Sequence, residues 1–333
     1  MNLTEFMTEW NNLSPYITVH TSGSTGRPKP IKVEKKRMEA SARLTCNYLG
    51  LGSEDTALLC MPLDYIAGKM VVVRSLVSGM RLINVKPSSH PMADVAEIPT
   101  FAAMTPMQVY GSMHIPSELN LLKRIRCLII GGGAIDDAME RELHNFPNAV
   151  WSTYGMTETL SHIALRRLSG DSADGWYTPF DNVDVSLGQD GCLIINAPDV
   201  CPETLYTNDI ARLHPDGRRF MIVGRKDNVI DSGGIKIHME EIEKALQPHL
   251  TVPYIATKCK DARLGEAVVL LVATGDISAV KAVCDEILPR YWRPKVYLSV
   301  SDVPFTETGK PARKKALEMA EKLISEKRTG RYE

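Results

Sequence analysis

Short apolar segments alternate with amphipathic segments along most of this chain. The segments "YITVH", "TALLC" and "CLII" are rich in β-branched and aliphatic residues, which favours strands, while the segments between them show the apolar spacing of helices. Strands that alternate with helices predict an α/β fold with largely parallel sheet layers, because each crossover helix returns the chain to the same end of the sheet.

The pattern changes between residues 177 and 223. Two Asp-Gly pairs, in "GQDGC" and "HPDGR", each lie between strand-like runs, which is typical of hairpins and predicts a small antiparallel region. Beyond this region helix-like and strand-like segments return. We therefore expect two domains, residues 1–225 and residues 226–333, of which the second is a small α+β domain.

Composition excludes several classes of partner. The chain has 333 residues and a formal net charge of −1, so no general basic field favours nucleic acid. The apolar run "MVVVRSLVSGM" is interrupted by Arg74 and is shorter than the ~20 residues that span a bilayer, so we expect no membrane partner. The seven cysteines are scattered without a CxxC pair, which predicts free thiols in a reducing, cytoplasmic compartment.

The segment "TSGSTGRPK" at residues 21–29 combines small hydroxyls, glycines and a lysine. Glycine lets backbone N–H groups turn toward a phosphate, hydroxyls donate to its oxygens, and lysine supplies charge. The spacing is not that of a Walker P-loop, and the "GGGA" run at residues 131–134 lacks the third glycine of a dinucleotide fingerprint. A solvated Gly/Ser linker is the alternative interpretation.

Four motifs in fixed order resemble those of the adenylate-forming superfamily, which includes acyl-CoA synthetases, adenylation domains of peptide synthetases and luciferases. "TSGSTGRPK" resembles its phosphate loop, and "YGMTET" resembles its adenine and magnesium motif. "YTNDIARLHPDGRRFMIVGRKDNVIDSGGIKIHMEEIE" resembles its ribose, hinge and C-terminal opening segment, and "FTETGKPARK" the segment of its catalytic lysine. The resemblance implies an enzyme that uses ATP, Mg²⁺ and coenzyme A.

The resemblance also implies a role for individual residues. Lys310, Thr157 and Glu158 would be catalytic, and Glu158 would bind the magnesium ion. The nucleotide would be held by Thr21, Ser22, Gly23, Ser24, Thr25, Gly26, Lys29, Gly131, Gly132, Gly133, Ala134, Tyr154, Gly155, Met156, Asp209 and Arg225.

Enzymes of this superfamily run two half-reactions, acyl-adenylate formation and then displacement of AMP by a thiol. The resemblance makes Asp227 the hinge about which residues 226–333 would rotate, and it puts Gly233, Gly234 and Lys236 on the coenzyme A side. Residues 1–225 would then be a shortened nucleotide-binding and acid-binding domain, because a whole subdomain precedes the phosphate loop in typical members. A homodimer is one way to cover the exposed face.

The stretch "CMPLDYIAGKMVVVRSLVSGMRL" resembles o-succinylbenzoate–CoA ligases of menaquinone biosynthesis, although Asp64 and Tyr65 depart from the usual pattern after Pro-Leu. An acid with two carboxylates and a ring needs donors for the carboxylate that does not react. Candidates for this pocket are Tyr65, Lys69, Thr105, Gln108, Ser161 and His162. The alternatives are another aryl-acid or fatty-acid ligase, an enzyme that loads a carrier protein, and a nucleotide-binding relative without catalysis.

Overall fold

The computed structural model describes residues 1–20, 30–133, 135–305 and 311–328. These residues form two compact units. The first unit contains residues 1–188, 194–207 and 213–221, and the second contains residues 189–193, 208–212 and 222–333. The predicted domain boundary after residue 225 stays a prediction, and each unit is described by itself.

A central sheet with the strand order β4-β3-β5-β6-β7-β8-β9 organises the first unit. Its strands are β3 (Thr56–Leu59), β4 (Arg81–Asn84), β5 (Phe101–Met104), β6 (Cys127–Ile130), β7 (Ala149–Gly155), β8 (His162–Arg167) and β9 (Thr178–Pro179). Strands β3 to β7 pair in parallel, whereas β8 and β9 pair antiparallel. The largely parallel sheet predicted from the alternating pattern is therefore confirmed.

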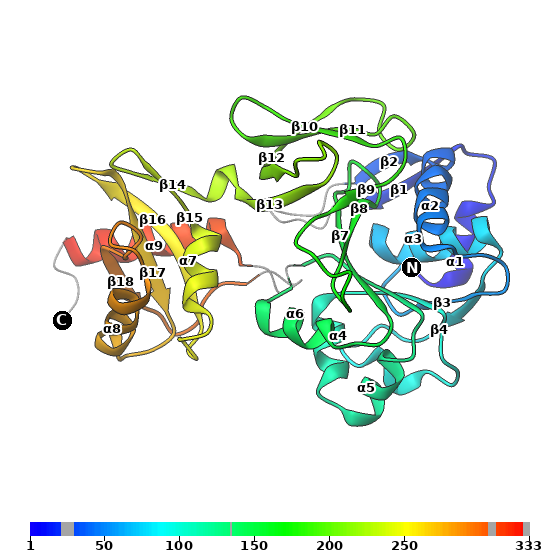
Figure 1. Cartoon of the computed structure of the whole chain (residues 1–333), viewed down its shortest axis with the longest axis horizontal. Helices are drawn as coiled ribbons and strands as arrows, with labels where there is room; N and C mark the ends of the chain where they lie inside the picture. The colour runs from blue at the N-terminus through cyan, green and yellow to red at the C-terminus, as the bar shows by residue number, and fades with distance from the viewer. Residues whose placement is uncertain (21–29, 134, 306–310, 329–333) are drawn as a thin grey trace. The chain divides into compact units, whose positions relative to one another are not determined.

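Helices cover both faces of the central sheet. They are α2 (Lys35–Leu49), α3 (Ile66–Ser78), α4 (Pro106–Met113), α5 (Pro116–Leu122) and α6 (Asp137–His144). Figure 1 shows α2 and α3 on one side of the sheet and α4, α5 and α6 on the other. Helix α2 ends at Gly50, which adopts the left-handed φ of 61° that is common for a glycine after a helix. Helix α6 begins after Asp136, whose side chain caps it by accepting from the Met139 N–H.

Smaller elements complete the first unit. Helix α1 (Leu3–Trp10) precedes an antiparallel pair, β1 (Tyr16–His20) and β2 (Pro30–Glu34), and the 3-10 helix η1 (Pro91–Asp94) precedes β5. A further sheet, whose residues are divided between the two units, has the order β10-β11-β12-β13. Its strands are β10 (Asp184–Leu187), β11 (Cys192–Asn196), β12 (Leu205–Leu213) and β13 (Phe220–Arg225), in the region predicted to form hairpins.

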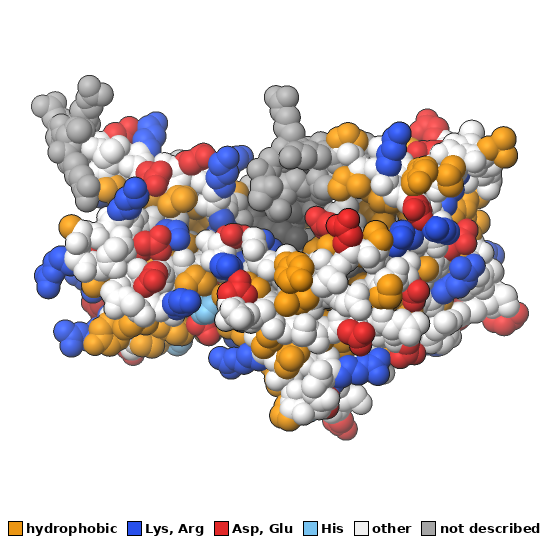
Figure 2. Space-filling view, turned by 90° about the horizontal axis from the view of Figure 1, so that it is seen from above, with side chains coloured by type: hydrophobic (Ala, Val, Ile, Leu, Met, Phe, Trp, Pro, Cys, Tyr) orange, Lys and Arg blue, Asp and Glu red, His pale blue; other side chains and the backbone are white. Residues whose placement is uncertain are grey.

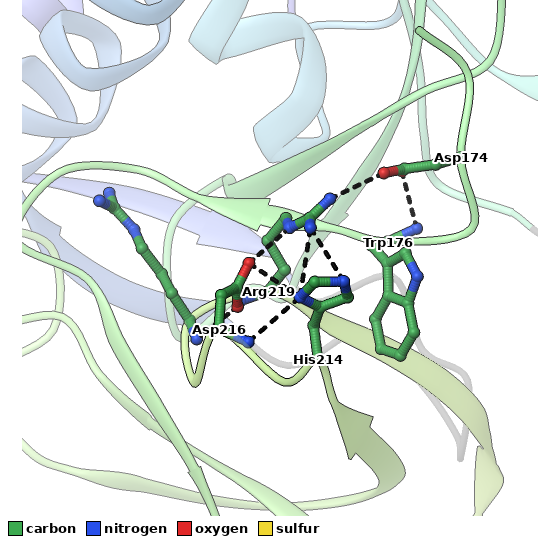
Figure 3. A network of polar contacts seen from close by, with 6 residues as sticks. Asp174, Trp176, His214, Asp216 and Arg219 are labelled. Carbon is green, nitrogen blue, oxygen red and sulfur yellow. Dashed lines mark hydrogen bonds and ion pairs between the residues drawn. The ribbon is translucent and has the colours of Figure 1, made fainter.

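A polar network closes the turn between β12 and β13 (Figure 3). Gly217 takes a φ of 74°, as one of the predicted Asp-Gly turns requires, and the Asp216 carboxylate accepts from two backbone N–H groups that follow it. The Arg219 guanidinium donates to Asp216 at 2.7 Å, to Asp174 at 2.9 Å and to the His214 ring at 2.9 Å. These contacts tie the turn to the segment that leads into β9.

The second unit is a small α+β arrangement. Its sheet has the order β15-β14-β17-β16, and β18 also pairs with β17. The elements are the 3-10 helix η2 (Lys226–Asn228), β14 (Val229–Ser232), β15 (Ile235–His238), α7 (Met239–Leu246), β16 (Tyr254–Asp261), β17 (Gly265–Val272), α8 (Ile277–Ile287), β18 (Val296–Ser299) and α9 (Arg313–Arg328).

Strand β17 divides two cores in this unit. Leu270 packs with Ile242 of α7 and Cys284 of α8, while its neighbour Leu271 packs with Ala316 of α9. Successive residues of a strand point to opposite faces, so the continuous apolar run "AVVLLV" is buried on both sides. Helices α7 and α8 contribute to the core on one face of the sheet and α9 to the core on the other, which gives this part of the chain its predicted α+β character.

The surface carries charges of both signs, as the near-neutral net charge suggests, and the cysteines are free thiols. The face in Figure 2 shows Lys, Arg, Asp and Glu side chains interspersed. All seven cysteines lie in the described part of the chain and are free thiols, and burial raises the pKa of Cys60 to about 12. Among the helices of the described residues, none combines the length and the apolar character that crossing a membrane requires.

Candidate active site

The carboxyl ends of β5, β6 and β7 bring three predicted site segments together. Gly131 follows β6, and its N–H donates to the Met104 carbonyl at the end of β5. A Cβ on Gly131 would lie 2.2 Å from Thr153 Oγ1 in β7, so only glycine fits between these strands. Gly132 and Gly133 face Thr105 and Pro106 at the start of α4. In a parallel sheet this edge is where ligands bind, because the loops there follow several adjacent strands.

Tyr154 is the predicted adenine contact and lies in β7 beside the glycine turn. Its ring is partly buried, 5.1 Å from the centre of the Phe220 ring and 5.7 Å from that of Tyr177. The ring therefore has aromatic neighbours within the first unit that hold its orientation. Ala134, another predicted nucleotide contact, lies outside the described residues.

The segment after Tyr154 is a tight turn that leads directly into β8. A Cβ on Gly155 would lie 2.3 Å from the Ser161 carbonyl oxygen, so the backbone passes over itself at this point. The Met156 N–H donates to Thr159 Oγ1 at 3.0 Å, and Leu160 takes a left-handed φ of 64°. A residue with a side chain is strained in that region, which indicates that the turn is held by its surroundings.

Thr157 and Glu158 lie in this turn, with Thr157 partly buried and the Glu158 carboxylate exposed to solvent. Mg²⁺ prefers oxygen ligands and takes the rest of its shell from phosphate and water, so one exposed carboxylate beside a hydroxyl fits the predicted ion. In the part of the chain that the structure describes, no three His, Cys, Asp or Glu side chains gather to hold a metal by themselves. The donor set therefore fits an ion that enters with a nucleotide.

Two of the candidate acid-pocket residues, Ser161 and His162, form a buried hydrogen-bonded chain with α2 and α3. Arg74 Nη2 donates to Ser161 Oγ at 2.5 Å, and Ser161 Oγ lies 3.2 Å from His162 Nδ1. His162 Nε2 lies 3.0 Å from Thr45 Oγ1, whose own proton goes to the Ser41 carbonyl. Because the Thr45 hydroxyl donates its proton to the Ser41 carbonyl, it accepts from His162, so the imidazole proton lies on Nε2 of a neutral ring. Burial, and then the charge of Arg74, hold the pKa of His162 well below 6.5.

Arg74 is the residue of this cluster that the sequence interpretation missed as a site residue. It is 2 % exposed, and burial lowers its pKa to about 10. Within the described residues no carboxylate pairs with it, and its Nε has no hydrogen-bond partner. The available signal was an arginine inside an otherwise apolar helical segment. The cluster of Arg74, Ser161 and His162 is called the arginine cluster below.

Other candidate acid-pocket residues serve the fold in ways the sequence did not indicate. Lys69 is buried and donates to the Thr18 carbonyl of β1 at 2.8 Å, and burial lowers the pKa of its ammonium group. Gln108 forms a capping box with Thr105 at the start of α4, and its amide nitrogen donates to the Cys60 and Ser88 carbonyls.

The role of Lys69, Thr105 and Gln108 in an acid pocket stays a prediction. Tyr65 precedes α3 and is 39 % exposed, so its ring is available to a ligand.

The predicted ribose and hinge residues lie together in the second unit. Arg225 Nη1 donates to Asp209 Oδ1 at 2.9 Å, and Arg225 Nη2 donates to Asp227 Oδ2 at 3.1 Å. Asn208 Nδ2 also donates to Asp227, at 3.2 Å. The Asp209 side chain is 13 % exposed and that of Asp227 is 58 % exposed. The arginine therefore bridges the two aspartates, and their roles toward a nucleotide stay predictions.

Gly233 and Gly234 form the turn between β14 and β15, with φ values of 64° and 83°. Two successive left-handed residues suit a tight hairpin, and a Cβ on Gly234 would meet nothing within 4 Å. A depression of about 790 Å³, lined in part by Asp231, Leu264 and Gly265, lies beside this turn. Lys236 is exposed and pairs in register with Asp231, so the predicted coenzyme A side is an open surface.

Several predicted site residues lie outside the described part of the chain. They are Thr21, Ser22, Gly23, Ser24, Thr25, Gly26, Lys29, Ala134 and Lys310. Strand β1 ends at His20, directly before the predicted phosphate loop, and Pro311 pairs with Phe305 directly after Lys310. The roles of these nine residues remain predictions from the motifs.

Comparison with solved structures supports the fold. An acyl-CoA synthetase (AMP-forming)/AMP-acid ligase II-like protein from Dyadobacter fermentans matches with a TM-score of 0.65 and 30 % identity, covering 95 % of this chain and 92 % of that one. O-succinylbenzoate coenzyme A synthetase from Bacillus subtilis, solved with ATP and magnesium ion, matches with a TM-score of 0.73 and 21 % identity, covering 90 % of this chain and 69 % of that one.

Sequence comparison finds relatives and a family model of the same kind. A 2-succinylbenzoate--CoA ligase from Listeria innocua is 26 % identical over an alignment of 347 positions, which covers 93 % of this chain and 71 % of that protein. One from Bacillus cereus is 25 % identical, over 92 % of this chain and 70 % of that protein. The family model described as AMP-binding enzyme matches residues 6–191, more than half of the chain. The chain belongs to the AMP-binding enzyme family, which is the adenylate-forming superfamily that its four motifs resemble.

Proposed function

We propose that this chain is an AMP-forming acid–CoA ligase whose acid is o-succinylbenzoate or a closely similar aromatic dicarboxylate. The family membership supports the general class, and the names of the relatives point to the acid. In the first half-reaction the acid would attack the α-phosphate of ATP and release pyrophosphate. In the second half-reaction the thiol of coenzyme A would displace AMP.

The residues of the chain serve this reaction by neutralising charge and aligning the reactants, because two anions must approach each other. Lys29 and the hydroxyls of residues 21–26 would hold the leaving pyrophosphate. Glu158 and Thr157 would hold Mg²⁺, which supplies positive charge to the phosphate oxygens when bound. Lys310 would bridge the acid carboxylate and the α-phosphate. Tyr154 would support the adenine, and Asp209 would accept from the ribose hydroxyls.

The arginine cluster is the observation that carries the choice of acid. Burying a guanidinium without a carboxylate partner costs free energy, which an anionic group of a ligand beside Ser161 would recover. A monocarboxylic acid has no anionic group left for this role once its carboxylate reacts. An acid with a second carboxylate has one, so the cluster favours a dicarboxylate.

The experiment measures AMP release with o-succinylbenzoate, benzoate, succinate and medium-chain fatty acids, each with and without coenzyme A. We expect clear preference for o-succinylbenzoate and AMP release that depends on coenzyme A. In Arg74→Met, the KM for o-succinylbenzoate should rise about 30-fold, because a charged hydrogen bond to the substrate is lost. Benzoate turnover should change little, which makes benzoate the internal control.

Stability separates this role from a structural one. Since Arg74 is buried without a carboxylate partner among the described residues, Arg74→Met should keep or raise the unfolding temperature. Equal losses with benzoate and o-succinylbenzoate would contradict the proposed pocket. Acid-dependent pyrophosphate exchange without AMP release on addition of coenzyme A would instead favour a carrier-loading enzyme, and no acid-dependent signal with any acid would favour a relative without catalysis.

A further inference from the structure

An aromatic pair to which the motifs assign no role holds the predicted adenine contact. Tyr177 and Phe220 form an isolated antiparallel bridge, in which the Tyr177 N–H donates to the Phe220 carbonyl at 2.7 Å and the Phe220 N–H returns to the Tyr177 carbonyl at 3.1 Å. Their rings stack with centres 5.5 Å apart and planes 22° apart. The backbone bridge and the ring contact therefore join the segment before β9 to the first residue of β13.

The polar network of Figure 3 fixes this pair from one side. Arg219 precedes Phe220, and its guanidinium pairs with Asp174, three residues before Tyr177. The Trp176 ring lies edge-on to the His214 ring with centres 4.9 Å apart. Both chain segments of the bridge are thus tied together next to the aromatic residues.

Strands β7 and β8 fix the pair from the other side. The Tyr177 hydroxyl shares a hydrogen bond of 2.8 Å with Ser152 Oγ in β7. The Arg166 guanidinium of β8 lies 5.6 Å from the centre of the Tyr177 ring. Glu140 of α6 holds this guanidinium through two hydrogen bonds of 2.5 and 2.9 Å, a geometry that fixes its plane.

The Tyr154 ring contacts both members of the pair. It meets Phe220 edge-on, with planes 76° apart, and it is tilted by 55° against Tyr177. Edge-to-face contacts orient a ring as well as bury it, since the positive edge of one ring meets the negative face of the other. Phe220 is 0 % exposed, so it can reach a ligand only through its neighbours.

We propose that Tyr177 and Phe220 are positioning residues for adenine, which hold the Tyr154 ring in the orientation that receives the base. The proposal rests on the adenine role given to Tyr154 above. It adds a support that joins α6, β7, β8, the segment before β9 and the start of β13. Loss of the pair should therefore weaken binding of the adenine of a nucleotide and leave binding of its phosphates unchanged.

The test is a double-mutant cycle on AMP binding, measured by calorimetry with no acid present. Phe220→Leu should weaken AMP binding about 10-fold, as expected for the loss of an oriented aromatic contact. Tyr154→Leu should weaken it by at least as much. In the double variant the second substitution should add less than about twofold, because Phe220 acts through Tyr154. Additive losses would overturn the proposal.

Pyrophosphate is the matched ligand, since it lacks the base. Its affinity should stay within about twofold in every variant, because the substituted side chains act on the base and not on the phosphates. An equal weakening of pyrophosphate and AMP would overturn the proposal. Phe101→Leu in β5 is the matched control, because Phe101 is also a fully buried phenylalanine of the first unit. It should lower the unfolding temperature and leave AMP affinity unchanged.

Two further variants cover the case in which Phe220→Leu does not fold. Tyr177→Leu removes the partly exposed ring and should weaken AMP binding as Phe220→Leu does. Tyr177→Phe keeps the ring and loses only the hydrogen bond to Ser152, so it should retain affinity within about threefold. Equal losses of AMP affinity in Tyr177→Leu and Tyr177→Phe would overturn the proposal. Binding of AMP needs no acid, so a failed acid panel would refute the proposed ligase activity and leave this test intact.

Discussion

At the scale of single residues, the buried charges of the first unit are the least expected feature. Arg74, Lys69 and His162 are each at most 7 % exposed, although charged side chains are rarely buried without a pair. Lys69 is satisfied by a carbonyl of β1 and His162 by two hydroxyls, whereas Arg74 has only the Ser161 hydroxyl among the described residues. The burial of these groups makes the first unit sensitive to pH.

His162 gives a prediction for that pH dependence. Its pKa in the folded protein lies well below the 6.5 of an unfolded histidine, because of burial and then of Arg74. Below pH 6.5 the unfolded chain therefore binds a proton that the folded chain does not, and the free energy of unfolding falls by up to about 1.4 kcal/mol per pH unit. Chemical denaturation between pH 7 and pH 5 should show this fall reduced in His162→Gln.

A second histidine variant serves as the control. His249 is exposed in the second unit, so its ring stays in water in both states and His249→Gln should keep the wild-type slope. A slope in His162→Gln equal to that of the wild type would show that the imidazole is protonated in the folded protein.

At the scale of elements, one ion pair joins three elements of the second unit. Arg313 begins α9 and forms two hydrogen bonds of 2.5 and 2.6 Å with the Glu243 carboxylate of α7. Arg313 also donates to the Ala256 carbonyl of β16, and Glu243 accepts from the Ala256 N–H. Both charged side chains are about four-fifths buried, with exposures of 21 % and 19 %. Arg313 lies three residues after Lys310, so this pair anchors the helix that follows the predicted catalytic lysine.

Removing one member of this pair should destabilise the second unit. Arg313→Met leaves the Glu243 carboxylate buried without its cation and should lower the free energy of unfolding by about 3 kcal/mol. Hydrogen exchange at the amides of β16 and α9 measures this loss. Arg313→Lys keeps the charge but loses the paired geometry, so it should fall between wild type and Arg313→Met.

An exposed ion pair of the same unit is the control. Arg293 and Asp285 lie 3.8 Å apart with exposures of 37 % and 46 %, so Asp285→Asn should change stability by less than about 0.5 kcal/mol. A loss in Arg313→Met no larger than this would refute the anchoring role of the buried pair.

At the scale of the whole molecule, the proposed reaction needs two arrangements of the chain, one for each half-reaction. The predicted hinge residue Asp227 is held in the second unit by Arg225 and Asn208. The next residue, Asn228, donates to Glu240 at the start of α7. These two sets of contacts are made by adjacent residues, which suits a hinge, because hinges concentrate large dihedral changes in a few positions.

Separate assays of the two half-reactions test this arrangement. Lys310→Ala should slow adenylate formation a hundredfold or more, since a cation at the reacting phosphate is lost, whereas thioester formation from supplied acyl-adenylate stays within about threefold. Asp227→Pro restricts φ and removes an N–H, so it should slow the two half-reactions unequally. Lys281→Ala, at an exposed position of α8, is the control. Equal loss of both half-reactions in Lys310→Ala would contradict the two-arrangement model.

The sequence by itself determined the elements and the order of the motifs. Caps and turns are local, so Gly50, Asp136 and the Asp216–Gly217 turn could be predicted from neighbours a few residues away. The four motifs indicated the family for the same reason, since each is a contiguous segment.

Only the tertiary structure decided which distant residues meet. Arg74 lies 87 residues from Ser161, and Lys69 lies 51 residues from Thr18. Phe220 reaches Tyr154 because a bridge to Tyr177 joins β13 to the central sheet. Such pairs depend on how helices and strands pack, and a side chain's local sequence does not encode its partner across the fold. The phosphate loop and the family could thus be predicted, whereas the arginine cluster and the aromatic support of Tyr154 could not.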